Sequence, residues 1–133
     1  MMGETRVVIV DRRDFDRFAL DLLCQQIPGV GVAASVASVT DAVGVLGGGA
    51  PVVLVGRQLL RVDGPDSVAR LRAAGAGRVI LVGTGDHRGL RAEAVRVDAD
   101  GVLERDGDTA SQAAVLRGES GTVPRWVEES AGS

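Results

Sequence analysis

The residues whose chemistry stands out follow short aliphatic runs, each of which ends in a polar side chain or in glycine. They are Asp11, Gly56 with Arg57, Gly83 with Thr84, and Arg105. A carboxylate binds cations, whereas guanidinium groups bind anions such as phosphate through charge-assisted hydrogen bonds. Gly56 follows the most continuous of these runs and has no side chain. The position where a reactive group is expected therefore carries none.

The elements that must position these residues are strands. The central run, residues 52–55, is too short for a helix and too continuous for a half-exposed strand, which is typical of a buried strand in a parallel sheet. Residues 6–10 and 78–82 repeat the pattern, and weaker strands are predicted over residues 30–36 and 101–103. Because ligands bind where the carboxyl ends of parallel strands enter loops, the residues that follow these strands form the candidate site.

Apolar residues at helical spacing predict helices between the strands. The first helix begins at Asp14 and ends before Pro28, and its predicted buried face carries Phe15, Phe18, Ala19, Leu22 and Leu23. Further helices are predicted over residues 39–46, 65–74, 90–97 and 108–117. Strands and helices that alternate at spacings of about 20 to 25 residues predict an α/β fold, a doubly wound five-stranded parallel sheet with right-handed crossovers.

Composition limits the class of protein. A chain of 133 residues fits one domain, and 45% hydrophobic with 25% charged residues is typical of a folded domain. The net charge of −3 gives no general positive field, so the chain by itself is not expected to bind nucleic acid. Cys24 is the only cysteine, which excludes an intrachain disulfide. No secretion signal and no membrane-spanning stretch is visible, so we expect a cytoplasmic protein.

The composition changes after Gly118, where Gly, Ser, Glu and Pro replace the apolar periodicity. We therefore predict one domain over residues 1–118. Residues 119–133 are predicted to be a tail, or the start of a linker to a further domain, with Trp126 as the residue most prone to make contacts.

Four short patterns follow one another along the chain. They are Val-Ile-Val-Asp11 at the end of the first strand, Pro28 after the first helix, Asp63-Gly64 beyond the central strand, and Ala99-Asp100-Gly101-Val102-Leu103 before Arg105 and Asp106. In this order and spacing, over residues 6–118, they resemble the receiver domain of bacterial response regulators, most closely the NarL/FixJ type. The resemblance implies a flavodoxin-like (βα)5 receiver fold with strand order 2-1-3-4-5.

In that family, Mg²⁺ is held by two adjacent acids after the first strand and by a phosphorylated Asp after the third. Asp11 matches the first of these acids, but Arg12 stands where the second belongs. The position of the phosphorylated Asp falls on Gly56, or on Arg57 if the alignment moves by one residue. One carboxylate beside guanidinium groups is not expected to hold Mg²⁺, because a hard dication needs several oxygen ligands.

The same family has a hydroxyl residue after the fourth strand, a Lys after the fifth, and an aromatic residue three positions before that Lys. Gly83 occupies the hydroxyl position with Thr84 next to it, Arg105 replaces the Lys, and Val102 replaces the aromatic residue. The resemblance therefore implies a degenerate pocket with no metal, no cofactor and no phosphate acceptor.

The sequence leaves several choices open. Asp11 either pairs with Arg105 or is a solvated carboxylate at a strand end, and the arginines of the rim, Arg12 and Arg13 included, either form an anion or small-molecule site or are ordinary surface residues. Residues 83–85 look like a nucleotide-binding loop, but the glycine spacing is wrong and the loop follows the fourth strand, so an enzyme is not expected. No partner for His87 is visible that would make it a ligand or a catalytic base.

The expected function is that of a phosphorylation-independent receiver, the regulatory and dimerising module of an atypical, orphan response regulator that controls transcription. The expected partners are a second copy of the chain and a C-terminal helix-turn-helix domain, if the chain is a fragment. A small-molecule (end-product) sensor and a stand-alone partner-binding receiver are the alternatives. The candidate dimer face, whose residues belong to the core in the alternative interpretation, consists of Val95, Val97, Ala113, Ala114 and Leu116.

Overall fold

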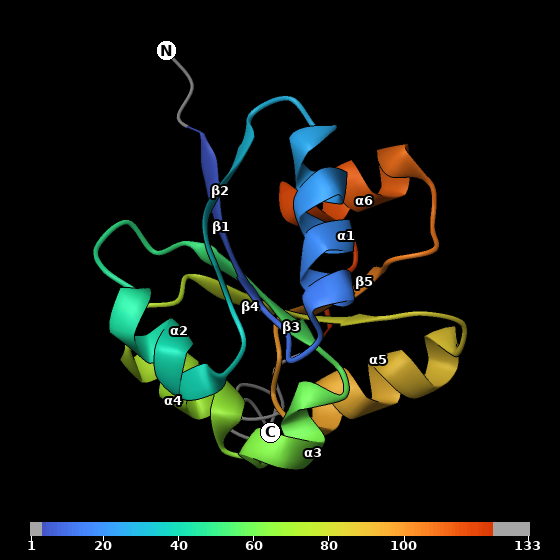
Figure 1. Cartoon of the computed structure of the whole chain (residues 1–133). Coiled ribbons are helices and arrows are strands. Elements are labelled where there is room, and N and C mark those ends of the chain that lie inside the picture. The colour runs from blue at the N-terminus through green and yellow to red at the C-terminus, as the bar shows by residue number, and fades with distance from the viewer. Residues whose placement is uncertain (1–3, 124–133) are drawn as a thin grey trace, which may run out of the picture.

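The computed structural model describes residues 4–123 of the chain. Within this range a five-stranded parallel sheet lies between two layers of helices (Figure 1). Its strands are β1 (Thr5–Val10), β2 (Val30–Val36), β3 (Val52–Gly56), β4 (Arg78–Gly83) and β5 (Gly101–Glu104). Their order across the sheet is β2-β1-β3-β4-β5, which confirms the predicted α/β fold and its strand order.

Helices cover both faces of the sheet. Those assigned within the described range are α1 (Asp14–Gln25), α2 (Val39–Val45), α3 (Leu59–Asp63), α4 (Ser67–Ala73), α5 (His87–Arg96) and α6 (Thr109–Leu116). Helices α1 and α6 lie on one face, and α2 to α5 lie on the other (Figure 1). The short helix α3 lies outside the predicted helices, and it follows β3 almost directly, with Leu59 and Leu60 buried against the sheet.

The continuous aliphatic runs are explained by burial on both faces. In β1, the side chains of Val7 and Ile9 join the core beneath α1 and α6, whereas Val8 and Val10 join the core beneath α2 to α5. Successive side chains of a strand point to opposite faces, so a strand covered on both sides must be apolar at every position. All four of these side chains are at most 1% exposed.

The predicted buried face of α1 is wrong. Phe15, Phe18 and Leu22 are 75%, 60% and 42% exposed, whereas Leu20 and Cys24 are fully buried. The helix is turned so that its row of residues at i, i+4 and i+8 faces inward, and this row begins at Asp16. Asp16, the first residue of this row, pairs with Arg105, a contact that the opposite rotation of the helix would break.

The packed part of the chain extends beyond Gly118. The N–H of Val102 donates to the carbonyl of Gly121 at 2.9 Å, and the N–H of Val123 donates to the carbonyl of Asp100 at 3.0 Å. Val123 is 2% exposed and belongs to the core, so the packed domain continues at least five residues past the boundary predicted from composition. Trp126 lies outside the described residues. None of the helices in residues 4–123 has the length and apolar character needed to cross a bilayer.

Candidate functional site

The carboxyl ends of four strands meet at one edge of the sheet. In the sheet register Val10 lies beside Val55, Gly56 beside Val82, and Gly83 beside Glu104. The residues that follow these strand ends therefore surround a common hollow of about 270 Å³. Of the predicted site residues, those that line it are Asp11, Arg57, Gly83, Thr84 and Arg105.

The other predicted residues lie around or away from this hollow. Arg12 lines an adjoining hollow of about 460 Å³, which also contains Asp11, Arg13 and Arg61. Val102 stands at the position of the family's aromatic residue and lines neither of these two hollows. Its side chain is 3% exposed and packs in the core beneath α5.

Gly56 is buried directly beneath Asp11. A Cβ atom added to Gly56 would overlap Oδ2 and Cγ of the Asp11 carboxylate, so the two positions compete for the same space. Asp11 is held there because its Oδ1 accepts the N–H of Arg13 at 3.1 Å. The place where an acceptor side chain would project is thus filled by the neighbouring carboxylate.

Partial burial controls the charge of Asp11. Desolvation raises the pKa of its carboxyl above the ordinary value of 3.8, and the nearby carboxylate of Asp16 adds to the rise. The hydrogen bond from Arg13 and the positive charges of Arg105 and Arg17 act in the opposite direction but do not cancel it. The folded protein therefore holds this proton to a higher pH than the unfolded chain does.

We expect Asp11→Asn to raise the melting temperature at neutral pH. Because the pKa of Asp11 is raised in the folded state, stability falls as the pH rises from 3.8 through the folded pKa, and Asn removes this loss. The amide oxygen of Asn can still accept the N–H of Arg13. Thermal unfolding followed by circular dichroism from about pH 4 to about pH 8 measures the difference, which should shrink toward the acidic end. A variant that is less stable than the parent at neutral pH would contradict the assignment.

Arg105 binds Asp16 and not Asp11, so the pair proposed between Asp11 and Arg105 is not formed. Nη1 of Arg105 lies 2.6 Å from Oδ1 of Asp16, which projects from the first turn of α1. In the same turn, Nη1 of Arg17 donates to the carbonyl of Asp11 at 2.7 Å. These contacts hold the first turn of α1 against the sheet edge, and they account for the rotation that exposes Phe15 and Phe18.

Arg57 is directed away from Asp11 by a carboxylate on α5. Its Nε lies 2.5 Å from Oε1 of Glu93, and its Nη2 lies 3.8 Å from Oδ2 of Asp86. Because Glu93 is only 12% exposed, this ion pair is better shielded from solvent than a surface pair.

The donor set at this edge does not fit Mg²⁺. Asp16 is engaged by Arg105, which leaves Asp11 as the carboxylate without a guanidinium partner in the hollow. Several oxygen ligands are needed for a hard dication, and the surrounding guanidinium groups repel it. Within residues 4–123 there is no group of three or more His, Cys, Asp or Glu side chains arranged to hold a metal ion.

Sequence reasoning missed Asp16, Gln58 and Arg61 as residues of the site. Asp16 lies on α1 opposite the face that the apolar spacing predicts to be buried, and Arg61 lies on α3, a helix outside the predicted ones. The signal in the sequence was the adjacent pair Leu59 and Leu60. Two leucines just after a strand end are expected to be buried, and a short helix buries them more readily than an open loop does.

The candidate dimer face does not form a surface strip. Leu116 is fully buried and Ala113 is 9% exposed, and both lie on α6 and face the core that it shares with α1. Val95 and Val97 are partly buried against the core on the other side of the sheet. Ala114 is partly buried as well, so the five residues are divided between the core and two separate helix edges and do not form one exposed face.

The fold and this edge of the sheet can be compared with known proteins. No protein-family model matches the chain, and no curated protein sequence matches it. Solved structures do match. The chain is similar to the signal receiver domain of the response regulator NarL from Mycobacterium tuberculosis, with a TM-score of 0.68 and 22% identity, over 89% of this chain and 98% of that domain.

Two longer response regulators are also similar. ChrA, from a heme-sensing two-component system, matches with a TM-score of 0.67 and 22% identity over 98% of this chain and 65% of its own. RcsB from Salmonella typhimurium, in a structure concerned with DNA interaction, matches with a TM-score of 0.68 and 18% identity over 90% of this chain and 62% of its own. The chain thus spans less than two thirds of these two proteins, and the likeness shows that it has the receiver fold.

Proposed function

We propose that this chain is the receiver-type regulatory domain of a response regulator, a signalling module and not an enzyme, and that it works without aspartyl phosphate. The single observation that supports the absence of phosphotransfer is the buried Gly56, whose missing side chain is replaced in space by the carboxylate of Asp11. Phosphoryl transfer needs an acceptor and a bound cation to neutralise the developing charge, and the hollow offers neither.

The proposal extends to transcription control and to self-association. Transcription control is supported by RcsB, whose structure concerns DNA interaction, and by the length of RcsB and ChrA beyond the part that this chain spans. We propose that a DNA-binding domain belongs to the same protein and that the receivers pair. Reading the gene beyond the codon for Ser133 and light scattering of the purified chain check these two parts.

The chain is expected to take up no phosphoryl group when it is incubated with acetyl phosphate and Mg²⁺. Intact mass spectrometry measures the uptake, and a receiver domain that carries the acceptor aspartate is the positive control in the same buffer. A parallel NMR titration with beryllofluoride is expected to leave the amide signals around Asp11, Gly56 and Arg105 unchanged. A phosphorylated species, or specific shifts at these positions, would show that the pocket still works as a phosphoacceptor site.

A further inference from the structure

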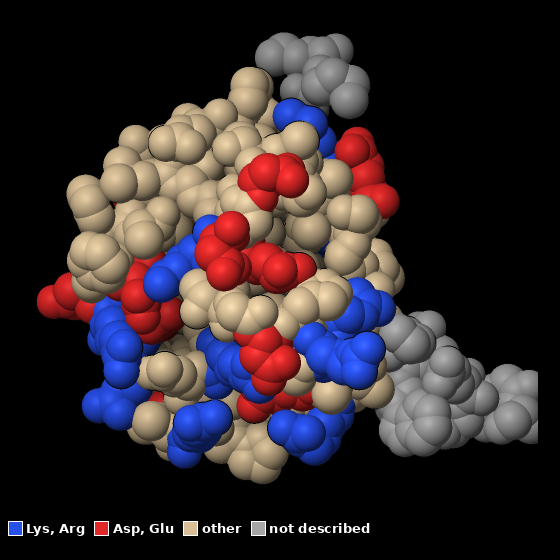
Figure 2. Space-filling model, turned by 90° about the vertical axis from the view of Figure 1, so that its right-hand side faces the viewer, with Lys and Arg blue, Asp and Glu red and all other residues tan. Residues whose placement is uncertain are grey.

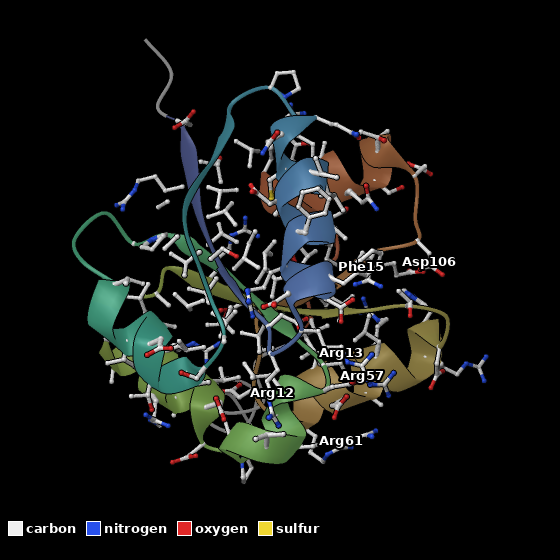
Figure 3. The ribbon with its side chains drawn as sticks, viewed as in Figure 1. Arg12, Arg13, Phe15, Arg57, Arg61 and Asp106 are labelled. Carbon is white, nitrogen blue, oxygen red and sulfur yellow. The ribbon has the colours of Figure 1, made fainter. Side chains whose placement is uncertain are left out.

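Arginines gather at the carboxyl edge of the sheet. The two adjoining hollows there are lined by five arginines against two aspartates, in a chain whose net charge is −3. The arginines come from four separate segments: Arg12 and Arg13 from the loop before α1, Arg57 from the end of β3, Arg61 from α3, and Arg105 from the loop after β5. Figure 3 shows Arg12, Arg13, Arg57 and Arg61 around the foot of α1 and the start of α3. The charge of this edge is therefore opposite in sign to that of the whole chain.

Three of these arginines are not neutralised. Arg57 and Arg105 are paired with Glu93 and Asp16. The guanidinium groups of Arg12, Arg13 and Arg61 make no ion pair and no hydrogen bond with any residue in the range 4–123. Figure 2 shows basic and acidic side chains side by side on the face that it presents, as expected where arginines are paired with carboxylates. Like charges held close together repel one another, so an anion placed between these three groups lowers the electrostatic energy of the folded state.

The geometry of the hollows favours phosphate as the anion. The hollow of about 460 Å³ has the size of a small-molecule site, and the hollow of about 270 Å³ is slightly smaller. Both hollows are lined by Asp11, Arg13, Gln58 and Arg61. Guanidinium forks that approach from different segments match the several oxygens of a phosphate, each of which accepts charge-assisted hydrogen bonds. The amide of Gln58 and the hydroxyl of Thr84 add neutral donors at the rim.

Asp11 sets where the anion sits. Its carboxylate covers Gly56 at the floor of the hollow and repels an anion there, so the anion is held at the outer rim by Arg12, Arg13 and Arg61. A ligand with two or more negative charges gains more from the three guanidinium groups than a singly charged anion does, because the attraction grows with the ligand's charge.

We propose that this arginine rim, defined as Arg12, Arg13 and Arg61, binds a small phosphate or polyphosphate ligand with at least two negative charges, without forming a covalent bond. The inference rests on the proposed function in one respect, because the ligand takes the regulatory role that a phosphoryl group has in a phosphorylated receiver. The binding itself does not depend on whether phosphotransfer occurs.

Inorganic pyrophosphate is the probe for this site. Titration of the full chain, at ionic strength kept constant with sodium chloride, is followed by calorimetry and by NMR of the backbone amides. We expect saturable shifts at Arg12, Arg13, Gln58 and Thr84, and weaker binding of inorganic phosphate. Arg13→Gln and Arg61→Gln are each expected to weaken pyrophosphate binding about tenfold, which corresponds to one charge-assisted hydrogen bond of about 1.4 kcal/mol. Both side chains are exposed and unpaired among the described residues, so both variants are expected to fold.

Arg117→Gln is the matched control. It removes the same charge from an exposed arginine at the end of α6, where the side chain contacts the carbonyl of Pro28 at 3.3 Å, remote from the carboxyl edge. Binding unchanged in this variant supports the proposal, whereas equal weakening in all three variants, or shifts that do not saturate, would overturn it. A phosphorylated species after treatment with acetyl phosphate would instead disprove the proposed function and leave the pyrophosphate result standing, so the two failures are distinguishable.

Discussion

Leu20→Ala is expected to lower the free energy of unfolding by about 2 to 5 kcal/mol, a large part of the total stability of a domain of this size. Leu20 is fully buried on the inner face of α1 and packs in the core formed with β1, β3 and α6. Removal of its branched end leaves a cavity that the rigid sheet cannot fill. Urea denaturation followed by far-ultraviolet circular dichroism measures the change.

Leu22→Ala is the matched control on the same helix. Leu22 is 42% exposed, so the same chemical change is expected to alter the free energy of unfolding by no more than about 0.5 kcal/mol. The two leucines are two positions apart, and their contrast reports the rotation of α1. If Leu22→Ala were the more damaging substitution, the helix would be turned as its apolar periodicity predicts, and the contacts of Asp16 and Arg17 would be in doubt.

Gly56→Asp is expected to destabilise the fold by about 1 to 3 kcal/mol and not to restore phosphorylation. The new Cβ overlaps the carboxylate of Asp11, and a second carboxylate at this buried position repels the first. Arg12 remains where a second metal-binding acid would be needed. The stability is measured by urea denaturation, and phosphoryl uptake from acetyl phosphate is measured by intact mass.

Two further variants separate the overlap from the chemistry of the new residue. Gly44→Asp makes the same substitution on α2, where an added Cβ meets no atom within 4 Å, and it is expected to change stability by no more than about 0.5 kcal/mol. The double variant combines Gly56→Asp with Asp11→Ala, which removes the overlapping carboxylate. It is expected to recover at least about 1 kcal/mol of the stability that Gly56→Asp loses. Additive effects of the two substitutions would show that Asp11 does not occupy the space above Gly56.

The sequence alone determined the sheet. Strands β1, β3, β4 and β5 carry runs of aliphatic residues that are buried on both faces, and glycine or a polar residue ends each run. There the local pattern and the tertiary environment agree, whereas the edge strand β2 is only partly buried. The same pattern located the carboxyl edge, because the residues that follow parallel strands must meet there. The sequence pattern alone therefore places Asp11, Gly56 and Arg105 at one edge of the sheet.

Only the tertiary structure decided which side chains face one another at that edge. Helical periodicity placed Phe15 and Phe18 inside, but Asp16 and Arg17 reach the sheet edge and turn α1 the other way. The spacing of the sequence equally allowed an ion pair between Arg105 and Asp11. The rotation of α1 brings Asp16 to Arg105, and the ion pair forms there. A run of apolar residues specifies burial over many positions, whereas the pairing of single charged groups depends on distances between segments far apart in the chain, which no local pattern contains.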